Sequence, residues 1–84
     1  MDMEYKKVWI EVVTRFLSEG GMRPEELVWS DGRRYLIERV RFVERVPAHV
    51  PSLLPVRYTC MIGGKEKYLY FEPQKQRWFV EVGQ

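Results

Sequence analysis

The chain has very little of what most catalytic and metal-binding sites need. Its 84 residues include one cysteine, Cys60, and one histidine, His49. A single cysteine rules out an intrachain disulfide and argues against a secreted disulfide scaffold, which favours a cytoplasmic protein. One histidine and one cysteine are too few for the usual zinc site, and no cluster of side chains has metal-binding spacing. We therefore expect no metal and no cofactor.

Motifs for phosphate binding and for catalysis are also missing. The sequence has no P-loop and no GxGxxG motif, and its two Gly-Gly pairs are typical of tight turns. The carboxylates occur singly except for Glu25-Glu26, so no general acid and base are paired. We expect His49 to face solvent in a loop, and Cys60 to pack as a small hydrophobic side chain. The sequence thus predicts neither an enzyme nor a small-molecule substrate.

Long hydrophobic runs are absent. The first segment, MDMEYKKVWIEVVTRFL, is interrupted by Glu11, Thr14 and Arg15. This pattern predicts neither a signal peptide nor a membrane span, so we expect no membrane partner. The length favours a single domain over residues 1–84, with a thin core.

What the sequence does have is alternation of apolar and polar residues. The segment Lys6–Leu17 alternates with a period of two, which predicts a strand. A helix is the alternative, because several apolar residues also fit helical spacing, but the β-branched content favours the strand. Two glycines and a proline then predict a loop over Ser18–Glu26.

The pair Asp31-Gly32 predicts a β-hairpin between Leu27–Ser30 and Arg33–Arg45. Asp-Gly suits a two-residue type I′ turn, in which both central residues have positive φ. The inward positions of the second arm change spacing between Ile37 and Val40, so we expect a β-bulge near Glu38-Arg39. The residues expected to point inward are Tyr35, Ile37, Val40 and Phe42.

The rest of the chain predicts one loop and three strands. Three prolines within Val46–Pro55 argue against a central strand there. Clean alternation from Val56 to Ile62, the Gly63-Gly64 turn and the segment KEKYLYFE predict a second hairpin. PQKQ then turns the chain into the final strand, RWFVEV. Short connections make neighbouring strands antiparallel. The predicted fold is all-β: a small antiparallel five- to six-stranded SH3-like barrel, or a strongly bent meander.

Charge and aromatic residues define a candidate interaction surface. Residues 1–32 carry a net charge of −3, residues 33–57 carry +4 and residues 58–84 carry +1. The aromatic residues outnumber what a thin core can hold, and some lie on strand faces opposite to the expected core. Exposed aromatics beside arginines are typical of protein interfaces and of single-stranded nucleic-acid sites. The candidate surface residues are Trp9, Arg34, Arg39, Arg41, Arg57, Tyr68 and Tyr70.

Several short motifs resemble a known family. The stretch WSDGRRYLIERV, the strand RYTCMIGG, LYFE and the final WFVE are similar to those of short uncharacterised bacterial proteins, mostly from Gram-positive anaerobes. That family shares a W-x-D-G-R-x-Y-x-I hairpin, an R-Y-T strand and a W-F-V-E ending. Its genes often lie near those for translesion DNA polymerases. The resemblance therefore implies an accessory role in DNA damage tolerance, but no activity, cofactor or catalytic residue.

Two functions follow from these observations. The first is a non-catalytic adaptor whose aromatic-rich face binds a protein partner or a second copy of itself. The second is a weak nucleic-acid binder that uses the arginines of the middle third. The net charge of +2 is low for a nucleic-acid-binding domain, which favours the protein partner or homodimer.

Overall fold

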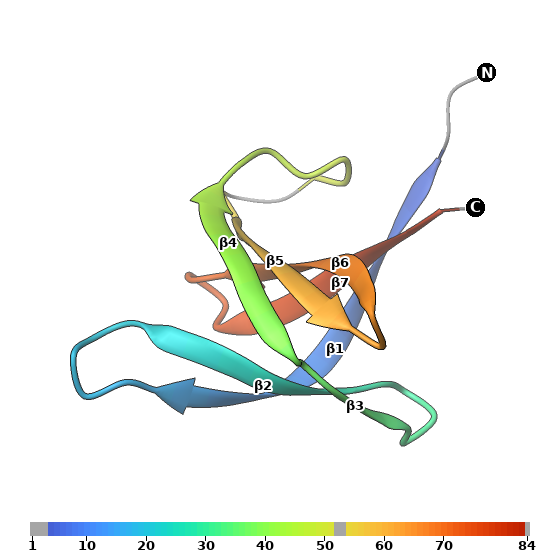
Figure 1. Ribbon diagram of the computed structural model, residues 1–84. Coiled ribbons are helices and arrows are strands. Elements are labelled where there is room, and N and C mark those ends of the chain that lie inside the picture. Colours follow the sequence, from blue (N-terminus) through green and yellow to red (C-terminus); the bar gives the residue numbers. More distant parts are fainter. Residues whose placement is uncertain (1–3, 52–53, 84) are drawn as a thin grey trace.

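The computed structural model in Figure 1 describes residues 4–51 and 54–83. These residues form seven strands, so the all-β class is confirmed and the expected number of five or six strands is too low. Every pairing is antiparallel. The strands are β1 (Tyr5–Phe16), β2 (Met22–Val28), β3 (Arg34–Leu36), β4 (Arg39–Arg45), β5 (Val56–Ile62), β6 (Lys65–Glu72) and β7 (Arg77–Gly83). No helix long and apolar enough to cross a membrane occurs among the described residues.

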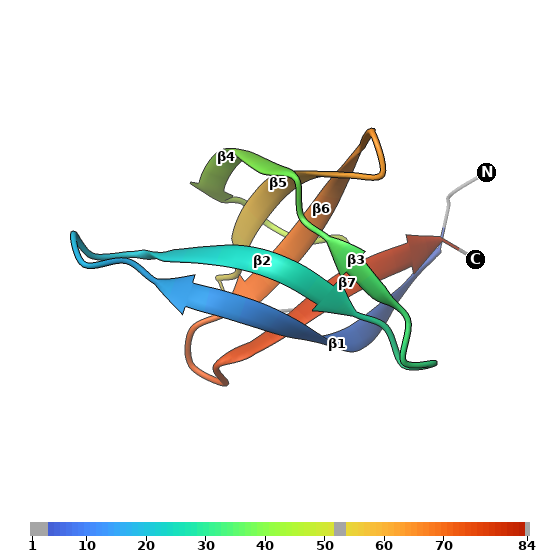
Figure 2. The ribbon, with the colours of Figure 1, turned by 60° about the horizontal axis from the view of Figure 1, so that its bottom comes forward.

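The seven strands belong to one sheet that curls into a half-barrel. Their spatial order is β3-β2-β1-β7-β6-β5-β4. The strand predicted over Lys6–Leu17 is confirmed as β1, and its two halves have different partners. Residues Tyr5–Ile10 pair with β7, whereas residues 11–16 pair with β2. The hairpin of β1 and β2 projects away from the remaining strands (Figures 1 and 2).

The two edge strands of the sheet are neighbours in the chain. The predicted long arm Arg33–Arg45 is divided into β3 and β4, with the bend at Ile37 and Glu38. The Ile37 N–H donates to the Glu25 carbonyl (2.9 Å), and the Glu38 N–H donates to the Met61 carbonyl (2.8 Å). Two consecutive amides thus connect opposite ends of the sheet. We expected a β-bulge near Glu38-Arg39, whereas the register against β5 shifts between Val40 and Phe42, at Arg41.

The loop predicted over Ser18–Glu26 is wrong for its second half, because β2 already begins at Met22. Proline has no N–H for a ladder and is usually confined to strand edges or bulges. Here Val13 faces Glu26 and Thr14 faces Pro24, so Glu25 is an extra residue and the register shifts beside the proline. A bulge therefore allows Pro24 to lie inside a strand and to be fully buried.

The hairpin at Asp31-Gly32 is confirmed, but its turn is not a two-residue type I′ turn. The Gly32 N–H donates to the Trp29 carbonyl, and the Trp29 N–H donates to the Arg33 carbonyl, both at 2.9 Å. Among residues 30–32, only Gly32 has positive φ, at 89°. This is a three-residue loop in which the final glycine takes the left-handed conformation. The Asp31 side chain contributes by accepting a hydrogen bond from the Arg33 N–H (2.9 Å).

The second predicted hairpin is confirmed in full. Ile62 pairs with Lys65, and the two residues between them, Gly63 and Gly64, have φ of 59° and 73°. Positive φ at both central positions is what a type I′ turn requires. The proline-rich segment Val46–Pro55 contains no strand among its described residues, as predicted; its residues 52 and 53 lie outside the described part.

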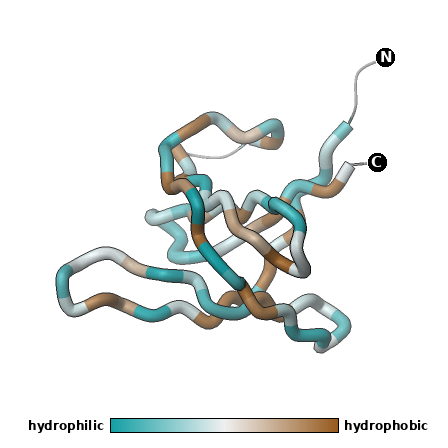
Figure 3. Tube along the Cα trace, viewed as in Figure 1, coloured by the Kyte–Doolittle hydropathy of each residue, from teal (hydrophilic) through white to brown (hydrophobic). Residues whose placement is uncertain are grey.

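Apolar side chains pack on both faces of the curled sheet. Hydrophobic and hydrophilic residues alternate along the strands, and hydrophobic residues also occur in the loop between β4 and β5 (Figure 3). The concave face carries the inner cluster, whose buried members are Ile37, Tyr58, Cys60, Leu69 and Trp78. The convex face carries the outer cluster of Val50, Tyr70 and Phe79, packed against Tyr5, Trp9, Val46 and Ala48. The loop therefore covers part of the convex face.

Candidate protein-interaction surface

The convex face of β4, β5 and β6 brings together most of the predicted surface residues. Directly paired residues of an antiparallel ladder share a face. One row across the three strands is Phe42–Thr59–Tyr68, and the rows beside it are Arg39–Met61–Glu66 and Glu44–Arg57–Tyr70. We call the exposed part of this grid the arginine–aromatic face. It consists of Arg39, Arg41, Phe42, Arg57 and Tyr68.

The aromatic rings of this face are exposed and lie beside guanidinium groups. Phe42 is 56% exposed and Tyr68 is 47% exposed. The Arg57 guanidinium carbon lies 4.3 Å from the centre of the Tyr68 ring, and that of Arg41 lies 5.7 Å from the centre of the Phe42 ring. The buried Thr59 separates the two rings in their row. Two exposed rings thus flank a small side chain on a pleated surface.

Carboxylates neutralise part of the positive charge. Arg57 Nη2 lies 2.8 Å from Glu44 Oε1, and Arg41 Nη1 lies 3.4 Å from Glu66 Oε2. The hydrogen bond to Glu44 raises the pKa of Arg57 above its usual value. Among the described residues, the Nε atom of Arg57 is buried without a hydrogen-bond partner. The face is therefore a mixed-charge surface and not a uniformly basic one.

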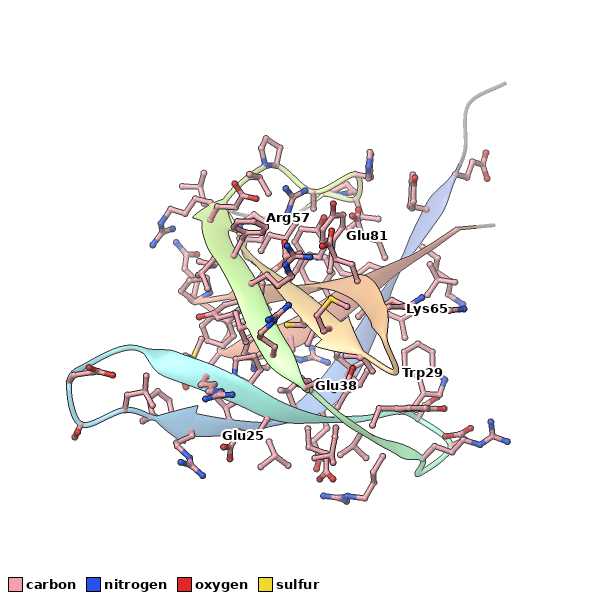
Figure 4. The ribbon with its side chains drawn as sticks, in the orientation of Figure 1. Glu25, Trp29, Glu38, Arg57, Lys65 and Glu81 are labelled. Atoms are coloured by element: carbon pink, nitrogen blue, oxygen red, sulfur yellow. The ribbon has the colours of Figure 1, made fainter. Side chains whose placement is uncertain are left out.

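Tyr70, which the sequence placed on the exposed side, is buried. The loop between β4 and β5 covers this position, and Tyr70 is only 2% exposed. Burial is the largest cause of the raised pKa of Tyr70, and the hydrogen bond of Tyr70 to Glu81 raises this pKa further. Arg57 and Glu81 lie close together beneath the loop (Figure 4), and both interact with the Tyr70 hydroxyl. Glu81 also accepts a hydrogen bond from the Val50 N–H (2.9 Å), which fastens the loop to the sheet.

Trp9 and Arg34 lie outside the arginine–aromatic face. Trp9 is half-buried against Phe79, with an edge contact at 5.7 Å between ring centroids. Three cations surround its ring, at 3.9 Å for Arg77, 4.8 Å for Lys7 and 5.3 Å for Lys75.

Arg34 lies on β3, where it forms an ion pair with Glu26. Hydrogen bonding to that carboxylate raises the pKa of Arg34. The expected surface is thus split, and only Arg39, Arg41, Arg57 and Tyr68 belong to one face.

Phe42 belongs to the face although the sequence predicted it to point inward. Its register partner is Thr59, whereas Val40 pairs with Cys60 on the concave side. The extra residue between them, Arg41, moves Phe42 to the convex side. A spacing of two residues normally places Val40 and Phe42 on the same face of a strand. Only the bulge moves Phe42 to the other face, so the sequence pattern alone does not reveal Phe42 as a surface residue.

Groups suited to nucleophilic or metal chemistry are few in the part of the chain that the structure describes. His49 stacks on Tyr5 with ring centroids 4.3 Å apart. Cys60 is fully buried, and burial raises its thiol pKa to about 11. No group of three potential metal ligands occurs there. In comparisons with known proteins, no family model, no curated protein and no solved structure matches the chain.

Proposed function

We propose that this chain is a non-catalytic cytoplasmic interaction module, built on a small SH3-like β-barrel, that docks on a partner protein through its arginine–aromatic face. The observation that supports this most directly is the pair of exposed rings, Phe42 and Tyr68, held across Thr59 with Arg41 and Arg57 over them. Aromatic residues and arginine are the types enriched in the centres of protein interfaces.

The mixed charge of the face favours a protein over a nucleic acid. Glu66 and Glu44 form ion pairs with Arg41 and Arg57. A phosphate backbone approaching this surface meets these carboxylates as well as the guanidinium groups. A protein partner with both charge signs can match the surface without displacing the ion pairs.

The experiment is a comparison of partner capture by four forms of the chain. Wild type, Phe42→Ser, Tyr68→Ser and Leu36→Ser are immobilised and exposed to the native cytosol. Leu36 is the matched control because it is 72% exposed but lies on β3. We expect one or more proteins retained by wild type and Leu36→Ser and lost by both face variants. Equal capture by all four forms contradicts the proposal.

A homodimer is the related possibility and has its own measurement. Sedimentation over a wide concentration range distinguishes a monomer from a dimer. A dimer that uses this face dissociates in Phe42→Ser and Tyr68→Ser but not in Leu36→Ser. A stable interface of this kind buries about 1,200–2,000 Å² in total.

The second candidate function is weak nucleic-acid binding in an accessory role in DNA damage tolerance. It rests on the arginines and on the ring of Tyr68, which lies ready to stack on a base. Binding of a single-stranded oligonucleotide should then weaken with salt, with a log–log slope of about −0.7 per phosphate contact. A slope near zero contradicts this function while leaving the protein-docking proposal in place.

A further inference from the structure

The ladder between β6 and β7 stops after three residue pairs. These pairs are Glu72–Arg77, Phe71–Trp78 and Tyr70–Phe79. Beyond these pairs, each strand is paired only with its other neighbour. Strand β6 pairs with β5 as far as Lys65, and β7 pairs with β1 as far as Gly83. Figure 2 shows β6 and β7 diverging from their connecting turn. The sheet is therefore open between these two strands.

The alternation of an antiparallel ladder determines which main-chain groups face the opening. A residue beside a two-residue hairpin loop forms a hydrogen-bonded pair across the hairpin, and such pairs recur at every second residue. Lys65, Lys67 and Leu69 thus direct their amides and carbonyls to β5. By the same alternation Glu66 and Tyr68 direct theirs toward the opening.

The facing strand follows the same rule. Val80 and Val82 bond to β1, which leaves the amides and carbonyls of Glu81 and Gly83 directed toward β6. Among residues 4–51 and 54–83, the ladder of β6 and β7 contains no pair that involves Glu66, Tyr68, Glu81 or Gly83. Unpaired edges of this kind are templates for strand addition.

A cleft of about 470 Å³ occupies the opening, and residues of both strands line it. Its concave side is apolar, with Leu27, Trp29, Ile62, Leu69 and Val80. An adjoining hollow of about 480 Å³ shares the first three of these residues. The cleft is thus continuous with an apolar end of the barrel.

Lys65 and Lys67 stand at the end of this hollow. Trp29 and Lys65 lie on the same side of the molecule in Figure 4. In the described part of the chain neither lysine has a carboxylate within ion-pair distance. The cleft therefore has an apolar floor and two lysines without a carboxylate partner at one end, while the carboxylates of Glu66 and Glu81 line its convex side.

We propose that this cleft accepts an extended segment of a partner protein, which adds a β-strand between β6 and β7. Because β6 and β7 are antiparallel, the added strand is parallel to one of them and antiparallel to the other. Its alternate side chains point toward Leu27, Trp29 and Ile62, so they are apolar. An acidic residue at one end pairs with Lys65 and Lys67. Arg57 and Tyr68 belong to the arginine–aromatic face and also line this cleft. The strand-addition proposal uses main-chain groups and the concave lining, and it does not depend on the proposed function.

The first measurement is amide hydrogen exchange by NMR in the free protein. We expect the amides of Glu66, Tyr68, Glu81 and Gly83 to exchange rapidly. The alternating amides that bond to β5 and β1, among them Leu69 and Val80, should be protected. Protection of all of these amides at every protein concentration means that the ladder is closed, and it overturns the proposal. Protection that grows with protein concentration means that a second copy occupies the cleft, which also overturns it.

The second measurement adds a probe, an acetylated heptapeptide that alternates threonine with valine and ends in aspartate. A saturating concentration should slow exchange of the four exposed amides by about tenfold or more. The control peptide has proline in place of its central residue, which removes a main-chain donor. Failure to bind at millimolar concentration, or binding that perturbs Arg41 and Phe42 and leaves the four amides unchanged, overturns the proposal.

A charge exchange tests the orientation of the added strand. Lys67 is exposed, so Lys67→Glu should fold normally. We expect this variant to bind the aspartate peptide about threefold more weakly and a lysine-ended peptide correspondingly better. An equal loss for both peptides contradicts the predicted pairing of the acidic residue.

Discussion

The Tyr70 ring stacks on Phe79, with ring centroids 5.0 Å apart and ring planes within 9° of parallel. The two residues are register partners on neighbouring strands. Their stack forms the centre of the outer cluster, and the loop between β4 and β5 packs against this cluster. The convex face therefore has two parts, a covered part over β6 and β7 and an open part over β4 to β6.

Removal of the Tyr70 hydroxyl, in the covered part, should lower stability more than removal of the Tyr68 hydroxyl in the open part. Tyr70→Phe keeps the ring stack but leaves Arg57 and Glu81 without their shared partner. We expect a loss of about 1–2 kcal/mol in the free energy of unfolding. Tyr68→Phe is the control and should change it by less than about 0.5 kcal/mol, because that ring is 47% exposed. Urea denaturation measures both, and equal effects would mean that Tyr70 is not covered.

Gly32 should tolerate substitution poorly although there is room for a side chain. An added Cβ would meet nothing within 4 Å, so any cost comes from the backbone, whose φ is 89°. We expect Gly32→Val to lose about 1–3 kcal/mol of stability. Arg34→Ala should leave the thermal midpoint nearly unchanged, because its ion pair with Glu26 is exposed. Thermal melts of the two variants measure these effects. A larger loss for Arg34→Ala than for Gly32→Val would contradict the described hairpin.

Lys7 should contribute more to stability than its neighbour Lys6. Its Nζ lies 2.8 Å from Oε1 of Glu72, whose side chain is 3% exposed. Lys7→Ala removes the nearer of two lysines from a buried carboxylate, since Lys75 lies at 3.7 Å. We expect a loss of about 2 kcal/mol, below the usual range for breaking a buried pair because Lys75 remains. Lys6→Ala, at an exposed position of the same strand, should be nearly neutral in the same unfolding measurement.

The Cys60 thiol should make stability fall at alkaline pH. Burial raises its pKa from 9.0 to about 11, so the folded protein retains the proton to higher pH than the unfolded chain. The resulting stabilisation is complete below pH 9 and is lost as pH rises through 11, with a total of up to about 3 kcal/mol.

Burial also raises the pKa of Tyr58 and Tyr70. These two hydroxyls therefore add to the loss of stability once the pH exceeds the usual pKa of tyrosine. The measurement is urea unfolding between pH 7 and 11 for wild type and Cys60→Ala. The variant should show a shallower decline, and identical slopes would contradict the role of the thiol. At pH 8, Cys60 of the folded protein should also react with a thiol reagent far more slowly than that of the urea-unfolded chain.

Local patterns predicted the elements whose geometry depends on adjacent residues. The Gly63-Gly64 turn follows from two residues that accept positive φ, and the strands β1 and β5 follow from the alternation of residue types along them. The burial of Cys60 follows from the same alternation. These features need no knowledge of distant parts of the chain.

The features that the sequence did not reveal depend on contacts between distant residues. Strand β2 starts before Pro24 because a bulge against β1 accommodates the proline, and this requires knowledge of the pairing. Phe42 turns outward because the register shifts at Arg41 against β5. Tyr70 is buried because a loop folds back over it and bonds to Glu81 through Val50. For the candidate surface, residue type was informative, whereas exposure depended on tertiary packing.

The paired amides of Ile37 and Glu38 have a consequence for the folding pathway. The hairpins β1–β2, β5–β6 and β6–β7 close over short loops and can form early. The bonds from Ile37 to Glu25 and from Glu38 to Met61 can be present together only when both halves of the sheet are formed, because each half supplies one acceptor. We therefore expect these two bonds to form late, and the halves to gain or lose structure together in one cooperative transition.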